Sequence, residues 1–158
     1  MSRRNRAVKR KILPDVKYDN MSISQFINVV VKEGKRSTGE KLVYDALDFM
    51  KKKIGGTDSE TTLFKAALDN IRPSVEVKSR RVGGANFQVP IEVPARRGVA
   101  LALRWMVDAA KKRSEKNMAQ KMGSELVQAY NNEGNSVRKK IETHKMADAN
   151  KAFAHFKY

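Results

Sequence analysis

Residues 72–94 are the only part of this sequence that has the pattern of β-structure. Apolar or small residues alternate with charged ones at a period of two in residues 75–80, and the alternation resumes in residues 87–91. Gly83-Gly84 lies between them and suits a two-residue hairpin turn, because both positions need positive φ. We therefore predict a β-hairpin at residues 74–91. Two strands alone are barely stable in water, so the hairpin must project from a larger body.

The rest of the sequence has helical periodicity, which predicts a body built from helices. Capping boxes at Ser22, Ser37 and Thr57 are expected to start the first three helices, and Gly34 is expected to end the first. The fourth helix is apolar on two sides, which favours a central, buried position over an exposed recognition patch at Trp105. The apolar stripes predict helices at about residues 22–33, 37–54, 57–71, 95–113, 115–130 and 136–150.

The expected fold is mainly α: a single helical domain of about six helices, with a protruding two-stranded antiparallel hairpin between the third and fourth. We expect a basic N-terminal arm at residues 1–17 and a helical domain at residues 18–150, which contains the hairpin. A basic and aromatic tail without a clear period is expected at residues 151–158.

The charge balance indicates a polyanionic partner. The chain has 33 Lys and Arg against 17 Asp and Glu, a net charge of +16, and such an excess opposes compaction by self-repulsion. Nucleic acid is the first candidate and an anionic membrane surface the second. No apolar run approaches the ~20 residues that span a bilayer, and no apolar signal core follows the basic start.

Residue types that would support catalysis or metal binding are few. The chain has no cysteine, so it has no disulfide, cysteine zinc site or thiol nucleophile. Gly83-Gly84 lies between strands rather than between a strand and a helix, so it is no dinucleotide motif. His144 lies on a helical stripe and is expected to be structural, with Val137, Ile141 and Ala147 beside it. We expect no enzyme, no metal site and no cofactor.

Exposed cations are expected in the arm, around the hairpin and in the tail, where they would displace counterions at phosphates. The arm and hairpin candidates are Arg3, Arg4, Arg6, Lys9, Arg10 and Lys11, then Arg72, Lys78, Arg80, Arg81, Arg96 and Arg97. Aromatic residues beside cations can stack on unpaired bases, which makes Phe87, Phe153, Phe156 and Tyr158 candidates. For Phe87, packing against the helical body is an equal alternative. His155 in the tail suits stacking or phosphate contact.

Several motifs together resemble one family, bacterial-type small-subunit ribosomal protein seven, along nearly the whole chain. The hairpin sequence of residues 71–90 is the most specific of them. The others are the start Met-Ser-Arg-Arg-Asn-Arg-Ala, the helix–Gly-Lys-Arg–helix pattern of residues 26–36 and 42–46, Arg97-Gly with Ala102-Leu-Arg-Trp105, and residues 144–155.

The resemblance implies a cytoplasmic, structural protein of the small ribosomal subunit. Members of this family bind the 3′ major domain of 16S-type rRNA, nucleate assembly of the 30S head and lie near the decoding region and exit site. They contact small-subunit proteins nine and eleven, and some repress their own operon through the message. The resemblance adds Lys35 and Arg36 to the rRNA-binding candidates. The resemblance also implies that the hairpin tip faces exit-site tRNA, and mRNA as a second RNA partner; the tip residues are Arg81, Val82, Gly83, Gly84 and Ala85. It implies that the tail contacts protein eleven through Phe153, His155, Phe156 and Tyr158.

Two other classes of protein fit parts of this sequence. A basic DNA-binding regulatory protein could use the helical body and would homodimerise on a palindromic site. A membrane-surface protein needs a helix with a wide apolar face opposite its cations, whereas the stripes here suit a core. The β-hairpin, the basic arm and the resemblance favour the ribosomal protein. For such a protein we expect no membrane contact and no obligate homo-oligomer.

Overall fold

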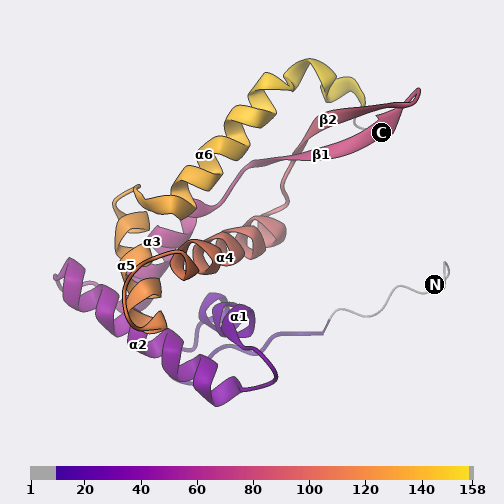
Figure 1. Ribbon diagram of the computed structural model, residues 1–158. Coiled ribbons are helices and arrows are strands. Elements are labelled where there is room, and N and C mark those ends of the chain that lie inside the picture. Colours follow the sequence, from indigo (N-terminus) through magenta and orange to yellow (C-terminus); the bar gives the residue numbers. More distant parts are fainter. Residues whose placement is uncertain (1–9, 157–158) are drawn as a thin grey trace.

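The computed structural model describes residues 10–156. Its elements are α1 (Met21–Val30), α2 (Arg36–Ile54), α3 (Glu60–Ile71), β1 (Val75–Val82), β2 (Ala85–Glu92), α4 (Ala95–Lys111), α5 (Met118–Tyr130), α6 (Gly134–Ala149) and the 3-10 helix η1 (Lys151–Phe156). Helices α1 to α5 form a body from which the hairpin and α6 extend side by side (Figure 1). The mainly α fold, with a two-stranded antiparallel hairpin between α3 and α4, is confirmed.

Helix α4 lies at the centre of the body, as its two apolar sides predicted. It contacts α1, α3, α5 and α6. Its inward side chains Ala102, Leu103, Met106 and Ala110 are buried in the same core as the stacked rings of Phe26 and Phe64, whose centroids are 5.4 Å apart. Trp105 is half-buried against this core, so it does not form the alternative exposed patch.

The first helix differs from the prediction at both ends. Asn20, rather than Ser22, caps α1, because its side-chain oxygen accepts hydrogen bonds from the backbone N–H groups of Ser22 (2.8 Å) and Ile23 (3.3 Å). The helix ends at Val30, before Gly34, whose positive φ of 75° belongs to the following loop. Val31 leaves the helical conformation, with a ψ of 129°, and packs over the backbone of Gly39 in α2.

The capping boxes expected for the second and third helices were also wrong. Helix α2 begins at Arg36 without a side-chain cap, and the Glu40 carboxylate pairs with Arg36 (2.7 Å) instead of reaching back to the amide of Ser37. In α3 the cap is Ser59 rather than Thr57, since the Ser59 hydroxyl accepts from an amide of the first turn. A neighbouring polar side chain therefore replaces the expected cap in α1 and α3, whereas α2 has no side-chain cap.

The later helices also differ from the prediction in two details. Helix α5 begins three residues later than expected, at Met118, and Glu115 instead pairs with Arg113 (2.9 Å) in the preceding loop. On α6, Ile141 is 47% exposed rather than part of the buried stripe. The structural role expected for His144 is confirmed, because its Nε2 accepts a hydrogen bond from the Ser74 backbone N–H (3.2 Å). Within residues 10–156, no helix combines the length and apolar character that crossing a bilayer requires.

Candidate nucleic-acid interface

The hairpin has the expected turn, and its register decides which side chains share a face. Gly83 and Gly84 both have positive φ (57° and 90°) and connect strands paired from Val75 opposite Glu92 to Val82 opposite Ala85. Directly opposed residues point to the same face, and the register pairs Lys78 with Val89 and Arg80 with Phe87. Cations of β1 and apolar residues of β2 therefore lie together on one face.

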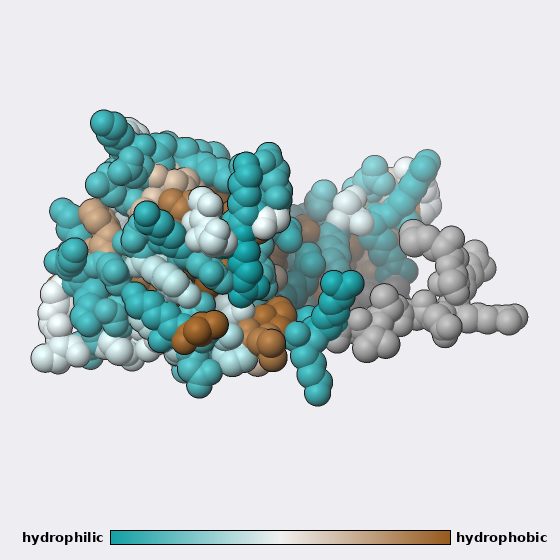
Figure 2. Space-filling view, turned by 90° about the horizontal axis from the view of Figure 1, so that it is seen from below, coloured by the Kyte–Doolittle hydropathy of each residue, from teal (hydrophilic) through white to brown (hydrophobic). Residues whose placement is uncertain are grey.

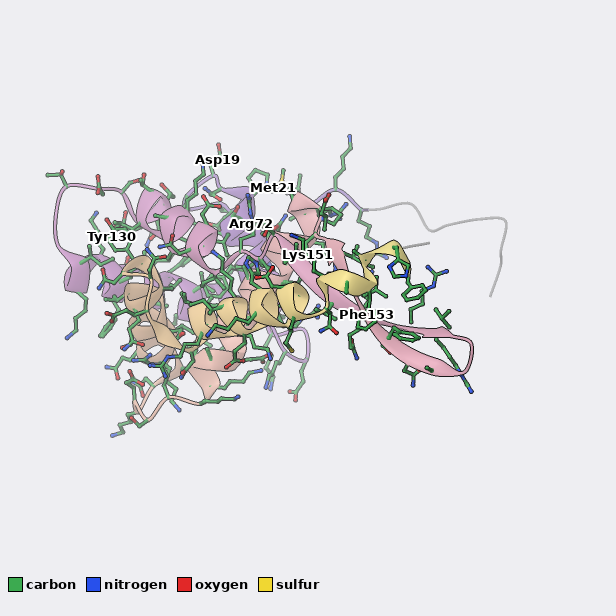
Figure 3. The ribbon with its side chains drawn as sticks, turned by 90° about the horizontal axis from the view of Figure 1, so that it is seen from above. Asp19, Met21, Arg72, Tyr130, Lys151 and Phe153 are labelled. Atoms are coloured by element: carbon green, nitrogen blue, oxygen red, sulfur yellow. The ribbon has the colours of Figure 1, made fainter. Side chains whose placement is uncertain are left out.

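Helix η1 packs against β2 on this face, through a group that we call the aromatic clamp: Phe87, Phe153 and Phe156. The Phe87 ring centroid lies 5.2 Å from that of Phe153 and 5.2 Å from that of Phe156. The Arg80 guanidinium adds a hydrogen bond to the Phe156 carbonyl oxygen (2.6 Å). Figure 3 shows Phe153 beside the hairpin. Residues 151–156 thus form a 3-10 helix although their sequence has no clear period, and Phe87 packs on the tail rather than on the helical body.

At the base of the hairpin, Arg97 of α4 is tied to Glu76 of β1. The Nε and Nη2 atoms of Arg97 donate to the two carboxylate oxygens of Glu76 at 2.7 and 2.8 Å. The Glu76 carboxyl is almost buried, and its hydrogen bonds with Arg97 lower its pKa from the ordinary value. Lys78 lies 3.6 Å from the same carboxylate. Two of the expected RNA-binding cations therefore share an internal partner.

Arg72 lies over the start of α4, and a glycine allows the approach. A Cβ added at Gly98 would lie 2.9 Å from the Arg72 Cγ and 3.4 Å from the Pro73 carbonyl oxygen. The Arg72 guanidinium is exposed and 3.6 Å from the Asp69 carboxylate, a distance at which the two charges interact weakly. The guanidinium is thus held at the junction of α3, the hairpin and α4.

The last residues of the expected arm are attached to α2 through Asp15. This carboxylate is buried, and it accepts a hydrogen bond from the Tyr44 hydroxyl (2.8 Å) and others from the backbone N–H groups of Lys17 and Tyr18. Burial and, secondly, the hydrogen bond to Asp15 raise the pKa of Tyr44 to about 12. The arm therefore leaves the body from a fixed point.

From this point the described part of the arm runs along a groove that it forms with α1 and α4. Three cations lie at this groove, Arg10 and Lys11 from the arm and Arg96 from the first turn of α4. Between them the groove is largely apolar, with Leu13, Met21 and Val99 among its lining residues. We call it the arm groove. The sequence predicted the cations but not the apolar surface between them.

The remaining candidates lie at three places. Lys35 and Arg36 are exposed at the start of α2, where they pair with Glu33 (3.1 Å) and Glu40 (2.7 Å). Arg81 is exposed at the hairpin tip, and His155 is exposed on η1. Arg3, Arg4, Arg6, Lys9 and Tyr158 lie outside the described residues.

The surface can bind a polyanion, and its described residues do not assemble a metal site. Within residues 10–156, no carboxylate lies within 4.0 Å of a side-chain nitrogen of Arg10, Lys11, Arg81 or Arg96, which leaves these charges available to phosphates. The same range contains no cluster of three acidic or histidine side chains that could hold a metal ion.

Comparison with known proteins gives one consistent result. The family model described as "Ribosomal protein S7p/S5e" matches residues 2–151. Curated relatives named "Small ribosomal subunit protein uS7" include those of Aeromonas hydrophila (54% identical), Gluconobacter oxydans (51%) and an Anaeromyxobacter species (51%). Each alignment spans 158 residues and covers the whole of both chains.

Proposed function

The chain belongs to the S7p/S5e family of ribosomal proteins, whose members are structural, non-enzymatic components of the small ribosomal subunit, and we propose that it binds 16S-type rRNA directly. Its site on the RNA is the 3′ major domain, where it nucleates assembly of the 30S head near the decoding region and the tRNA exit site. Its place in the cell is the small subunit, in the cytoplasm.

The observation that carries this proposal is the arrangement of cations around the arm groove and the hairpin base. Segments far apart in the sequence meet there, because the last residues of the arm are anchored to α2 through Asp15 and Arg96 lies in the first turn of α4. The hairpin projects from the body (Figure 1), and its strand β1 carries Lys78, Arg80 and Arg81. Such a surface fits the phosphates of a folded RNA, in which shape and backbone contacts dominate recognition.

We assign different partners to the two ends of the projecting part. The hairpin tip, with exposed Arg81 and two glycines, reaches toward exit-site tRNA and mRNA, while rRNA binds nearer the body. The tail contacts small-subunit protein eleven, and small-subunit protein nine is a second protein partner of the chain. Because Phe153 and Phe156 already pack on Phe87, the tail contacts protein eleven through its exposed residues, such as His155.

The functional units are then the arm (1–17), the helical domain with its hairpin (18–150) and the tail (151–158). The same RNA-binding surface serves repression of the protein's own message.

The test is binding to an RNA fragment of the 3′ major domain across a salt series. Replacing Lys35 and Arg36 with glutamine should weaken binding and lower the magnitude of the salt slope by roughly 0.7–0.9 for each lost phosphate contact. The matched control is the pair Lys52→Gln and Lys53→Gln, which removes two exposed cations from the other end of α2.

The outcomes separate the assignment of the target from that of the residues. Equal affinity for fragments of other rRNA domains would refute the 3′ major domain as the target. Equal slopes for the wild type and the Lys35/Arg36 variant would remove those two residues from the interface.

A further inference from the structure

The arm groove exposes apolar side chains in a chain that is otherwise strongly charged. Leu13 is 78% exposed and Met21 is 54% exposed, and both line the groove together with Val99. Figure 2 shows apolar side chains interrupting an otherwise hydrophilic face. Exposed apolar surface inside a basic site indicates a ligand that has both a flat apolar part and negative charge.

The polar residues of the groove define the rest of that ligand. Arg10, Lys11 and Arg96 supply three cations, and no acidic side chain lines the groove among the described residues. Ser22 and Gln25, from the first turns of α1, supply a hydroxyl and an amide. An amide side chain can donate and accept at the same time, which suits the edge of a nucleobase.

We propose that the arm groove binds one unpaired nucleotide of the small-subunit RNA. The base lies on Leu13, Met21 and Val99, and its flanking phosphates contact the three cations at the groove. This inference rests on the proposed function, because it specifies how the RNA contacts the arm groove. Apolar contact with the base therefore adds to the binding free energy of an interface in which the other contacts are ionic.

Charge complementarity distinguishes the nucleotide from the other occupants that the groove could accept. Residues 1–9 of the chain carry four cations, Arg3, Arg4, Arg6 and Lys9, and no acid, so the cations at the groove repel them. A second copy of the chain has the same net charge of +16 and is repelled as well. A nucleotide brings an apolar ring and the opposite charge.

The first experiment measures the affinity of the full chain for the 3′ major domain fragment after Leu13→Ser and Met21→Ser. We expect binding about tenfold weaker, in the range of losing one base contact, with an unchanged salt slope because no cation is removed. Arg96→Gln should instead lower the magnitude of the slope by roughly 0.7–0.9. The matched control is Val16→Ser, since Val16 is 96% exposed but does not line the groove.

The second experiment places a photoreactive diazirine analogue of leucine at position 13 in the complex with RNA. A crosslink to a nucleobase supports the proposal, and a crosslink to residues 1–9 or to a second protein copy overturns it. If the wild type binds the RNA fragment and the variants Leu13→Ser, Met21→Ser and Val16→Ser all bind it with equal affinity, the proposed nucleotide site is also overturned. Failure of the wild type to bind the fragment would refute the proposed function itself. Thermal melts by circular dichroism check that the variants are folded.

Discussion

Replacing Arg97 with alanine should destabilise the protein rather than weaken its contacts with phosphate. The Arg97 guanidinium donates two hydrogen bonds to the Glu76 carboxylate and thereby joins α4 to β1 at the root of the hairpin. In the variant, that carboxylate, with only 11% of its side chain exposed, keeps only Lys78 at 3.6 Å. The removal therefore leaves an almost buried charge without its main partner.

The expected loss follows from the burial of the two partners. Breaking a fully buried ion pair costs about 3–5 kcal/mol, and an exposed pair contributes about 0.2–1 kcal/mol. Glu76 is nearly buried, but the Arg97 side chain is 49% exposed, so solvent screens part of the interaction. We expect a loss of about 2 kcal/mol in the free energy of unfolding, which lowers Tm by about 4–8 °C for a domain of this size.

Urea unfolding of Arg97→Ala, Glu76→Ala and the double variant measures the coupling between the two side chains. A coupling energy of about 1–2 kcal/mol is expected at pH 7. The pKa of Glu76 is lowered in the folded state, so its contribution is present above the ordinary value of 4.5 and is lost as the pH falls through the folded pKa. Wild type and Glu76→Ala should therefore converge in stability under acid.

The same variants decide what Arg97 does in the complex. The salt slope of RNA binding should be unchanged in Arg97→Ala, because this guanidinium donates to both oxygens of an almost buried carboxylate, unlike the exposed single pairs of Lys35 and Arg36. A coupling below about 0.5 kcal/mol together with a lower slope would refute this reasoning and return Arg97 to the phosphate contacts.

Two further predictions concern the ends of the described chain. Phe156→Ala should loosen η1 on Phe87, where Phe153 remains, at a cost of about 0.5–1.5 kcal/mol beyond the lost burial. Amide exchange should become faster in β2 and stay unchanged in α4. Unchanged exchange in β2 would show that the aromatic clamp does not hold the hairpin. Tyr44→Phe should lower the free energy of unfolding by about 1–2 kcal/mol, because the variant loses the hydrogen bond to Asp15, and urea unfolding measures this loss. The variant should also bind RNA more weakly in the salt series, because the arm is less well anchored. Wild-type values in both assays would exclude an anchoring role for Tyr44.

The fold could be predicted from the sequence because its main signals are local. The alternation around Gly83-Gly84 and the two apolar sides of α4 each lie within one segment, and the structure has both features as expected. The starts of the helices could not be predicted as well. Asn20 and Ser59 compete with nearby serines and threonines of similar chemistry, and the choice between them depends on the geometry of the chain.

The site was harder to predict because its partners are distant in the sequence. A count of charges treats Arg97 as an available cation, whereas its pairing with Glu76 depends on where α4 meets the hairpin. The tail has no period, so nothing local indicates that Phe153 and Phe156 pack on Phe87. The apolar part of the arm groove likewise needs Leu13 and Val99 to meet from separate segments.

The hairpin also bears on the protein before it meets RNA. A two-stranded ribbon has two edges, each with backbone groups that could recruit a strand from another molecule. Here β1 presents Lys78, Arg80 and Arg81, whose charges repel a second copy, and β2 contains Pro90, which has no N–H to offer. The cations of β1 and the proline of β2 therefore disfavour strand pairing between the hairpins of two copies of the chain.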